Sequence, residues 1–341
     1  MSYSRLSPWL AAGAALMFVL PVVAQDWKFA LEEIEGSVQD LWAQKFKEVV
    51  EEQTDATVTI YPYGTLGTSD QLTDLVANGA LQLAFASPGH LGSLIPEIQV
   101  FSLHYLLSED DEVNKQVLSD SPTIYETLAP KFEDKDLQLL TMFPTGEMVW
   151  TTKKEIRAPE DFANFKMRTM VSPMLVAAYE ALGASPTPLP YGEVYGGLQL
   201  GMIDGQVNPL YAIEEMKFYE VSDYMIFAGQ QEFTTTVVMS PMWYDMLSEE
   251  EQAVVQDATT AANDYIYAEV ANINEERLNV IKTAKPEMTI ITLDDEERAA
   301  FKEASMAARE TFKEDVEGGA EILDALVAEF ESAAEEMGGS N

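Results

Sequence analysis

Apolar and polar residues follow two different periods along the chain. The runs 27–31, 57–63 and 81–87 are apolar or alternate in polarity, which is typical of β-strands. Between the first two runs, apolar residues recur every three or four positions from 36 to 53, which predicts a helix with one buried face. This alternation of strand and helix continues along the chain, and it predicts an α/β protein with mainly parallel sheets.

Turn and cap residues predict where several helices begin and end. Ser172 followed by Pro173 predicts a helix start, and Gly183 predicts its end. Neither Gly nor Pro occurs between Ser248 and Ala284, which predicts one helix about 50 Å long at a rise of about 1.5 Å per residue. A helix of that length can cross from one domain to another.

The chain is long enough for two domains, and it contains no obvious linker. It has 341 residues, of which 47% are hydrophobic, and this is slightly long for a single domain. No internal sequence repeat or low-complexity stretch separates two halves. We therefore expect two domains that exchange strands. The first comprises residues 25–148 plus 236–275, and the second comprises residues 149–235 plus 276–341.

Residues 1–24 have the layout of a secretory signal peptide. One positive charge, at Arg5, precedes an apolar run from Trp9 to Val23 that ends in small residues. A membrane anchor is the alternative, but this run is short for a span of about 20 residues. We expect cleavage after Ala24 and a mature protein in the periplasm.

The charge balance excludes some partners and some chemistry. Against 20 Lys and Arg stand 58 Asp and Glu, a net charge of −38, which would repel nucleic acid phosphates. The acids are spread along the chain, which favours a surface adapted to high salt, where screening removes their repulsion. The unfolding temperature, measured against NaCl concentration, tests that hypothesis. Cysteine is absent, which excludes disulfides, thiolate metal ligands and thiol nucleophiles.

Common enzyme signatures are missing from the chain. It has no glycine-rich nucleotide loop, no GxSxG elbow and no HExxH motif, and we expect no catalytic residue, cofactor or metal. His90 follows a strand end and is a candidate to line a cleft, although a surface or packed position is the more ordinary one for a histidine. His104 lies among apolar residues and is expected in the core with a backbone partner.

One long region carries a specific pattern. Between residues 165 and 214, a strand ending in Arg precedes a helix, the sequence ALGAS, the phrase GEVY, a Leu-Gln pair and then GxxDGxxNP. This order resembles the solute-binding component of tripartite ATP-independent periplasmic (TRAP) transporters. YPYGTLG at 61–67 and the long late helix extend the resemblance over the mature chain. The resemblance implies a two-domain periplasmic binding protein fold, with a ligand cleft between the domains and a helix that spans both.

Two residues of this region are candidate ligand contacts. Arg168 stands where a strand gives way to a loop, and its planar guanidinium suits a carboxylate, although a surface ion pair competes on composition alone. The resemblance implies that Arg168 binds the carboxylate of the ligand and that Asn208 assists. An Asx turn before Pro209 is the structural alternative for Asn208.

A narrower set of segments resembles the ectoine-binding members of this family. The segments are 29–44, 87–96, 146–152 and 188–199. The resemblance implies that Glu33 meets the cationic ring of a zwitterion, where a solvated acid at a helix N-terminus is the alternative. It also implies aromatic walls, which attract cations. The tyrosines at those positions are Tyr63, Tyr191 and Tyr211.

The candidate pocket also departs from those members. Tyr191 stands where they have Trp, and Ala212 follows Tyr211 in place of a second aromatic residue. Glu147 lies in a stretch where many carboxylate-binding relatives carry an additional Arg. With one Arg and the candidate acids Glu33 and Glu147, the pocket would repel a dicarboxylate and suit a zwitterion or a small ammonium compound.

These patterns predict a monomeric solute-binding subunit that is not an enzyme. We expect it to capture an ectoine-like compatible solute by hinge closure and to deliver it to the membrane permease of a TRAP transporter. The same patterns are also compatible with two other ligands, a small organic ammonium compound and an ordinary organic carboxylate. They are compatible with two other functions as well: an extracytoplasmic enzyme with Glu33 or Glu147 as base, and a sensory subunit that reports to a receptor.

Overall fold

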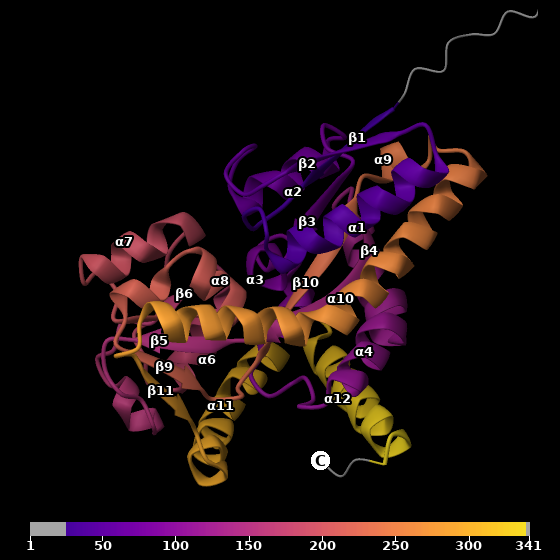
Figure 1. The fold of residues 1–341 in the computed structure, drawn as a ribbon. Coiled ribbons are helices and arrows are strands. Elements are labelled where there is room, and N and C mark those ends of the chain that lie inside the picture. The colour runs from indigo at the N-terminus through magenta and orange to yellow at the C-terminus, as the bar shows by residue number, and fades with distance from the viewer. Residues whose placement is uncertain (1–24, 339–341) are drawn as a thin grey trace, which may run out of the picture.

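The computed structural model describes residues 25–338, which form two lobes (Figure 1). The strands are β1 (Asp26–Ala30), β2 (Thr57–Tyr61), β3 (Leu83–Ala86), β4 (Gln138–Glu147), β5 (Val149–Thr152), β6 (Arg168–Thr169), β7 (Thr187–Pro188), β8 (Gly205–Asn208), β9 (Tyr224–Phe227), β10 (Glu232–Met239) and β11 (Thr289–Thr292). The first lobe is built on a sheet of order β2-β1-β3-β10-β4, and the second on a sheet of order β11-β9-β5-β8. The predicted α/β class is confirmed.

The prediction of mainly parallel sheets is wrong for the strands near the junction of the lobes. β1 runs parallel to β2 and β3, and β9 runs parallel to β11. β10, however, is antiparallel to β3 and β4, and β5 is antiparallel to β8 and β9. The chain passes from β4 to β5 through Met148 alone, and from β9 to β10 through residues 228–231. These direct crossings lack the helical crossover that parallel neighbours need.

Helices cover both sheets, and α6 and α10 begin at the predicted caps. They are α1 (Val38–Gln53), α2 (Ser69–Ala77), α3 (Pro88–Leu91), α4 (Asp111–Asp120), α5 (Ala129–Glu133), α6 (Pro173–Ala181), α7 (Val194–Gln199), α8 (Leu210–Glu215), α9 (Pro241–Tyr244), α10 (Glu249–Ala284), α11 (Asp295–Asp315) and α12 (Gly319–Glu336). The side chain of Ser172 caps α6, and Ser248 forms a capping box with Glu251 at the start of α10.

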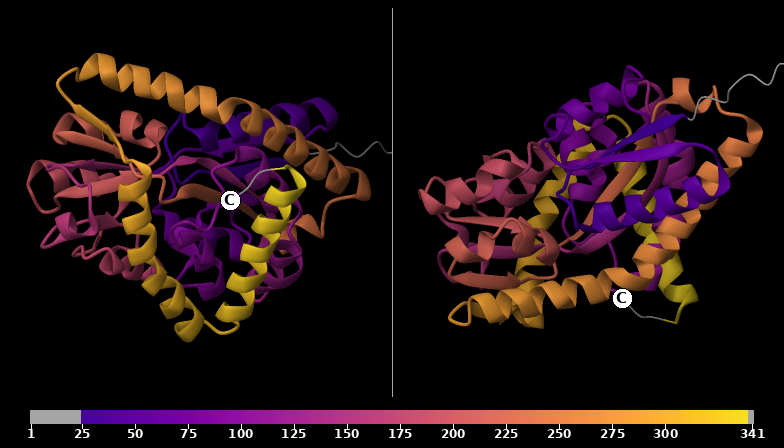
Figure 2. Two further views of the ribbon diagram at one scale, coloured as in Figure 1. Left: turned by 90° about the horizontal axis from the view of Figure 1, so that it is seen from below. Right: turned by 45° about the horizontal axis from the view of Figure 1, so that its top comes forward.

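The long helix predicted between the domains is present as α10. It has 36 residues, packs on α1 in the first lobe and on α8 in the second, and lies along both lobes in Figure 1. α11 and α12 form a V beneath the lobes (Figure 2), in which α11 packs on α6 and α12 packs on α4. The C-terminal helices therefore also link the two lobes, and the domain boundaries given above remain a prediction.

Aromatic side chains fill the core of each lobe. In the first lobe, Trp42 stacks on Phe46 and Phe143, with ring centroids 5.4 and 5.9 Å apart. In the second lobe, Trp150 of β5 meets Phe301 edge-on at 5.3 Å. His104 is buried, as predicted, but neither ring nitrogen has a partner among the described residues, so the expected backbone partner is wrong. Burial lowers the pKa of His104 to about 4, which keeps the ring neutral.

Two predictions about the membrane concern different parts of the chain. The predicted signal peptide and its cleavage after Ala24 lie outside the described residues. Within residues 25–338, no helix is long and apolar enough to cross a membrane.

Candidate functional site

A small cavity lies between the lobes, and five of the predicted site residues line it. Its volume is about 20 Å³, enough for roughly one water molecule. The first lobe contributes residues that follow β1 and β3, and one residue of β10, while the second lobe contributes residues around β6, α7 and β8. The lining residues are Glu32, Glu33, Ser87, His90, Arg168, Met170, Tyr191, Asn208 and Phe233.

Arg168 presents an unpaired cation to this cavity. Pairing of β6 with β7 fixes its backbone, and its Nε donates to the carbonyl oxygen of Leu189 at 2.9 Å. Its side chain is buried, with 2% of the residue exposed, and Nη2 has no hydrogen-bond partner in the described part of the chain. Burial lowers the pKa of Arg168 to about 10, so the guanidinium remains charged at neutral pH. A buried cation without a partner is unfavourable, so this end of the cavity is complementary to an anion.

Glu33 presents a carboxyl group on the opposite lobe. It follows β1, and its Oε1 accepts a hydrogen bond of 2.6 Å from the hydroxyl of Tyr211. Its Oε2 is buried and finds no partner within residues 25–338. Burial raises the pKa of Glu33 to about 8, the bond from Tyr211 opposes that rise, and the charge of Glu32 adds to it. This carboxyl group would ionise fully beside a bound cation.

Glu32 and Ser87 also belong to the site, although they were not predicted. Oε2 of Glu32 accepts from the backbone N–H of Ser87 at 2.8 Å, which joins the loop after β1 to the end of β3. Oε1 of Glu32 and Oγ of Ser87 are buried and unpartnered among the residues described. Two neighbouring carboxyl groups therefore face the cavity. Their adjacency in the sequence, directly after a strand, was the signal that could have identified Glu32.

The three predicted tyrosines surround the carboxyl and guanidinium groups at different depths. Tyr191 lines the cavity, and its buried hydroxyl has no partner in the described structure. Tyr63 packs edge-on against Tyr191 with ring centroids 5.6 Å apart, and its hydroxyl accepts from the backbone N–H of Gly192 at 3.3 Å. Tyr211 lies behind Glu33, with its hydroxyl 3.0 Å from Oγ1 of Thr145. The contact of Tyr63 with residues 191 and 192 joins the two lobes.

Asn208 is held at the end of β8 by the amide side chain of Gln206. Its Nδ2 donates to Oε1 of Gln206, and Nε2 of Gln206 donates to Oγ1 of Thr151 at 2.8 Å. Only 9% of Asn208 is exposed, and it lines the same cavity as Arg168. The amide network fixes its orientation before any ligand arrives.

Comparison with known proteins identifies the family of the chain. Residues 29–315 match the family model described as bacterial extracellular solute-binding protein, family 7. The chain belongs to this family. It is 43% identical over 332 residues to the ectoine-binding periplasmic protein TeaA of Halomonas elongata, with 96% of this chain and 97% of TeaA covered. It is 42% identical over 325 residues to the ectoine/5-hydroxyectoine-binding periplasmic protein UehA of Ruegeria pomeroyi, with 95% and 96% covered.

Solved structures of proteins from TRAP transporters have a fold similar to that of this chain. The high-resolution structure of the periplasmic ectoine-binding protein from the TeaABC TRAP transporter of Halomonas elongata superposes with a TM-score of 0.88 at 44% identity. That alignment covers 90% of this chain and 100% of the other. The apo-state structure of TeaA gives a TM-score of 0.80, with 91% of this chain and 100% of the other covered. The predicted resemblance to TRAP solute-binding proteins is confirmed.

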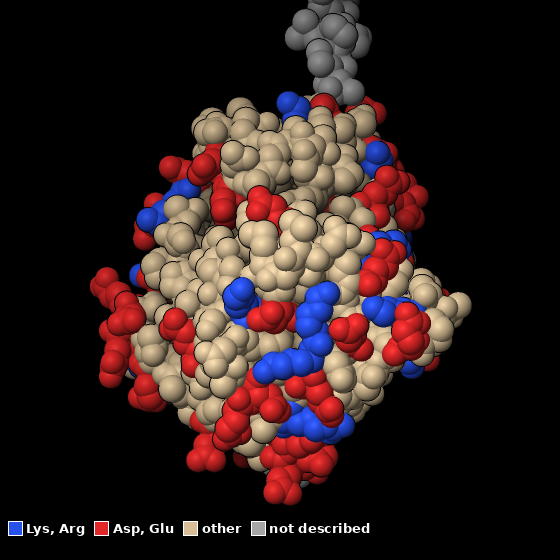
Figure 3. All heavy atoms as spheres, turned by 90° about the vertical axis from the view of Figure 1, so that its left-hand side faces the viewer, with Lys and Arg blue, Asp and Glu red and all other residues tan. Residues whose placement is uncertain are grey.

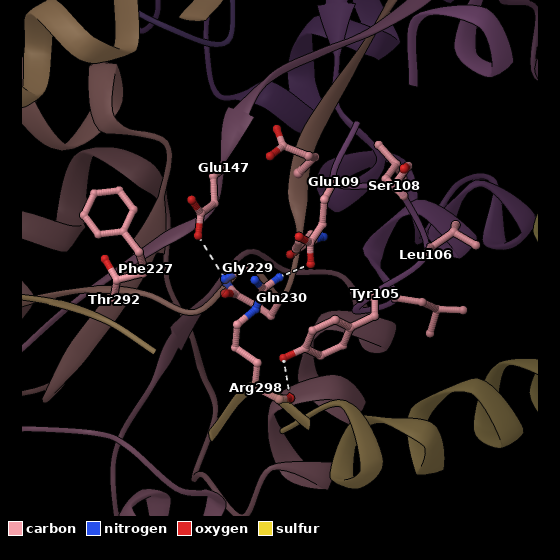
Figure 4. A pocket seen from close by; sticks show the side chains of 14 residues that line it. Tyr105, Leu106, Ser108, Glu109, Glu147, Phe227, Gly229, Gln230, Thr292 and Arg298 are labelled. Carbon is pink, nitrogen blue, oxygen red and sulfur yellow. Dashed lines mark hydrogen bonds and ion pairs between the residues drawn. The ribbon is translucent and has the colours of Figure 1, made fainter. Parts of the chain in front are cut away.

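Glu147 is the one predicted site residue of this family 7 protein that the structure places elsewhere. It ends β4 opposite Glu232 of β10, and it accepts from the backbone N–H of Gly229 at 2.9 Å. It lines a separate pocket of about 260 Å³ together with Tyr105 and Arg298 (Figure 4). The strand runs on into β5 after one residue, which leaves the Glu147 side chain outside the cavity of Arg168.

His90 was the least certain candidate from sequence, and it lines the cavity of this solute-binding protein. It lies in α3, directly after β3, with Nδ1 3.7 Å from Oδ1 of Asp70. Met170 and Phe233 line the same cavity. Sequence patterns did not reveal either of them, because apolar wall residues have the same periodicity as core residues.

Proposed function

We propose that this protein is the extracytoplasmic subunit of a TRAP transporter that binds a small zwitterion of the ectoine type. One observation carries the proposal. Nη2 of Arg168 and Oε2 of Glu33 lie on opposite lobes of one cavity, both buried and both without a partner among the described residues. A molecule with a carboxylate at one end and a cation at the other satisfies both groups at once.

The neighbouring acids narrow the nature of the cation. Oε1 of Glu32 and Oε2 of Glu33 are both unpartnered acceptors facing the cavity. A cation with two N–H donors, such as the cyclic amidinium of ectoine, can donate to both acceptors. A quaternary ammonium group has no N–H and would leave both acids without a hydrogen bond. The identities of 43% to TeaA and 42% to UehA support the same class of ligand.

Binding requires the lobes to separate and then to close around the solute, with more space between them than in the present arrangement. The cavity of about 20 Å³ has no room for an organic solute in its present state. The contacts of Tyr63 with Gly192 and with Tyr191, which lines the cavity, join the two lobes beside it. Since the ligand contacts come from both lobes, a bound solute favours the closed state over the open one.

The other candidate ligands leave part of this site unsatisfied. An ordinary organic carboxylate would pair with Arg168 and leave Glu33 buried beside an anion. A simple ammonium compound would pair with Glu33 and leave Arg168 unpaired. We expect both to bind more weakly than a zwitterion, because a buried charge without a partner is costly.

Two alternative functions remain to be compared with transport. A carboxyl group with a pKa raised to about 8 also suits a general base, so Glu33 on its own does not distinguish a binding protein from an enzyme. The curated relatives with ectoine in their names are binding proteins, which favours binding without chemistry. Delivery to a permease rather than to a receptor, a monomeric state, and the lack of cofactors and nucleic acid partners also belong to this proposal.

Calorimetry with a panel of solutes tests the proposal. The panel contains ectoine, glycine betaine, succinate and a small primary amine, each titrated into the protein in molar NaCl. We expect ectoine to bind at least tenfold more tightly than the others, and NMR to recover it unchanged after prolonged incubation. Tighter binding of succinate would contradict the zwitterion, and turnover of the solute would show an enzyme.

A further inference from the structure

The pocket of Glu147 contains two carboxyl groups at opposite positions of a strand pair. Glu147 of β4 lies directly opposite Glu232 of β10, and both line this pocket of about 260 Å³. Like charges at directly opposite positions destabilise an antiparallel pair. Burial raises the pKa of Glu232 to about 8, and the charges of Glu147 and Asp111 add to that rise. A cation between these acids would remove their repulsion.

Several hydrogen-bond acceptors of this pocket are unused. One oxygen of Glu147 accepts from the backbone of Gly229, whereas the side chain of Glu232 makes no hydrogen bond or ion pair within residues 25–338. Gln231 lines the pocket as well, and its Oε1 is buried without a partner in the same part of the chain. Buried acceptors without a donor are costly, so a ligand that donates hydrogen bonds would stabilise this region.

The basic residue of this pocket already has a partner. Arg298 is the one Lys or Arg among the described residues that line it, and its Nη2 is paired with Glu109 (Figure 4). The rings of Tyr105 and Phe227 lie on either side of the pocket in the same view, and aromatic faces attract cations. The pocket therefore has spare acceptors and no spare guanidinium, which suits a cation and not a zwitterion.

The pocket adjoins a wider groove beside α4, α11 and α12. The groove has a volume of about 990 Å³, and it shares residues 105–109 and Gly229 with the pocket. Its lining includes four consecutive acids, residues 109–112, and apolar side chains such as Leu106 and Phe330. The groove thus continues the acidic lining of the pocket along a partly apolar wall.

Acids outnumber bases around the pocket and the groove together. The bases are Arg298, Lys302 and Arg309, and Nη2 of Arg309 donates to the backbone carbonyl oxygens of residues 104 and 105. On the face of the molecule in Figure 3, by contrast, Asp and Glu project from the surface, and many lie beside Lys or Arg. The acids of the pocket and groove are Glu109, Asp110, Asp111, Glu112, Glu147, Glu232 and Glu331.

We propose that the pocket and the groove bind a linear aliphatic diamine or polyamine. One ammonium group lies between Glu147 and Glu232 and also donates to Gln231, since an ammonium group has three N–H donors. The methylene chain packs against the apolar wall at Leu106, and the next ammonium group meets the acids of residues 109–112. This site is separate from the solute cavity, and the inference does not depend on the proposed function.

Calorimetry with the diamine putrescine tests this site. Molar NaCl screens the general attraction of a diamine to a chain of net charge −38, whereas a buried pocket is screened much less. Butylamine is the matched ligand, because it has the same carbon chain and a single ammonium group. We expect putrescine to bind saturably, at least tenfold more tightly than butylamine. A lack of saturable binding, or equal affinities for the two amines, would overturn the proposal.

Variants of the facing acids locate the bound diamine. Glu232→Gln should weaken putrescine binding at least tenfold, and Glu147→Gln should do the same, because each removes one carboxylate from the ammonium group. Glu52→Gln is the control, since Glu52 is an exposed acid of α1 and its substitution changes the charge equally. It should stay within twofold. The unfolding temperature shows that each variant is folded, and equal affinities in all three folded variants would contradict the site.

Glu33→Gln separates this site from the solute cavity. It should leave the affinity for putrescine within twofold, and saturating ectoine should not displace putrescine. If putrescine binding is lost in Glu33→Gln and retained in Glu232→Gln, the diamine occupies the solute cavity and the second site is wrong. If the unmodified protein binds no ectoine, the proposed solute is wrong, and the putrescine titrations still measure the second site.

Discussion

Two pairs of acids, Glu32 with Glu33 and Glu147 with Glu232, line two different pockets, and they differ in what surrounds them. Burial raises the pKa of Glu33 in the cavity and of Glu232 in the second pocket, each to about 8. Glu147, opposite Glu232 in the β4–β10 pair, accepts from the backbone of Gly229, and the nearby Arg298 is paired with Glu109 (Figure 4). In the cavity, by contrast, Glu32, Glu33 and Arg168 each retain an atom without a partner among the described residues.

This contrast explains why we propose the cavity of Glu33, and not the second pocket, as the site of the zwitterionic solute. A raised pKa reports loss of water around a carboxyl group, and Glu33 and Glu232 share that loss. Unfilled hydrogen-bonding capacity of both charges, on facing sides of one cavity, is found around Glu33 and Arg168. The pocket of Glu147 is larger, at about 260 Å³ against about 20 Å³, so volume alone would select a different pocket from the one proposed above for the solute.

Removal of the two arginines should give the largest difference between the sites. Arg168→Ala should weaken ectoine binding at least 100-fold, about 3 kcal/mol, because the carboxylate of the solute would lose its charged partner. Arg298→Ala should change the affinity by less than threefold. Isothermal titration calorimetry measures both, and equal losses would show that the two pockets are coupled in binding.

Neutralisation of the acids should give the next largest effect. Glu33→Gln should weaken ectoine binding 10- to 100-fold, about 1.4 to 2.8 kcal/mol, and leave the weak binding of succinate unchanged or improved. Glu147→Gln is the matched control and should stay within twofold. If the affinity of Glu33→Gln for ectoine equals that of the unmodified protein, the preference for a zwitterion is wrong.

Sequence reasoning predicted both charged groups of the proposed site but could not assign every acid to its pocket. Arg168 was predicted from its place at a strand end and from the family resemblance, and Glu33 from the resemblance to the ectoine-binding members. Glu147 was placed in the same pocket on similar grounds, but whether its side chain faces the cavity depends on the pairing of β4 with β10. That pairing joins residues about 90 positions apart, so it cannot be predicted from local periodicity.

The same reason explains the errors in the fold. Strands β1, β2 and β3 and the long helix α10 follow from local periodicity and caps, and they were predicted. The antiparallel position of β10 between β3 and β4 was not, because it depends on how the chain returns from the second lobe. Glu32 and Ser87 were missed because their contact joins the ends of two strands and leaves no local pattern.

Solute binding should also release protons, and this release should come from Glu33 and not from Glu232. We expect this effect to be smaller than those of the substitutions above. Between pH 4.5 and about 8, folded Glu33 keeps a proton that the unfolded chain has lost, so its contribution to the free energy of unfolding falls as pH rises through this window. A protic cation favours the ionised carboxylate, so binding at pH 7 should release up to about one proton, and affinity should increase with pH up to about 8.

Calorimetry in buffers with different ionisation enthalpies measures this release. Glu33→Gln should abolish it, whereas Glu232→Gln should retain it, although Glu232 also has a pKa raised to about 8. If proton release disappears in Glu232→Gln and persists in Glu33→Gln, the group that releases the proton lies in the second pocket.

The smallest effect should come from the contact of Tyr63 that joins the two lobes beside the cavity. Tyr63→Phe removes the hydroxyl that accepts from the backbone of Gly192 at 3.3 Å and keeps the ring beside Tyr191. We expect affinity to fall two- to threefold, about 0.5 kcal/mol, through faster dissociation. Stopped-flow fluorescence measures the rate, and Tyr61→Phe on β2 is a matched control. An unchanged dissociation rate would show that this hydrogen bond does not hold the lobes together.

The position of β10 also constrains how the protein can fold after export. β10 ends at Met239 and lies between β3 and β4 in the first sheet. An exported chain that emerges from its N-terminus presents β1, β2 and β3 long before it presents their missing neighbour. The edge of β3 stays open until about two thirds of the chain has crossed the membrane, and an open edge invites pairing with other chains. The first lobe is thus completed late in translocation, and shielding of that nascent edge is a requirement for the yield of folded protein.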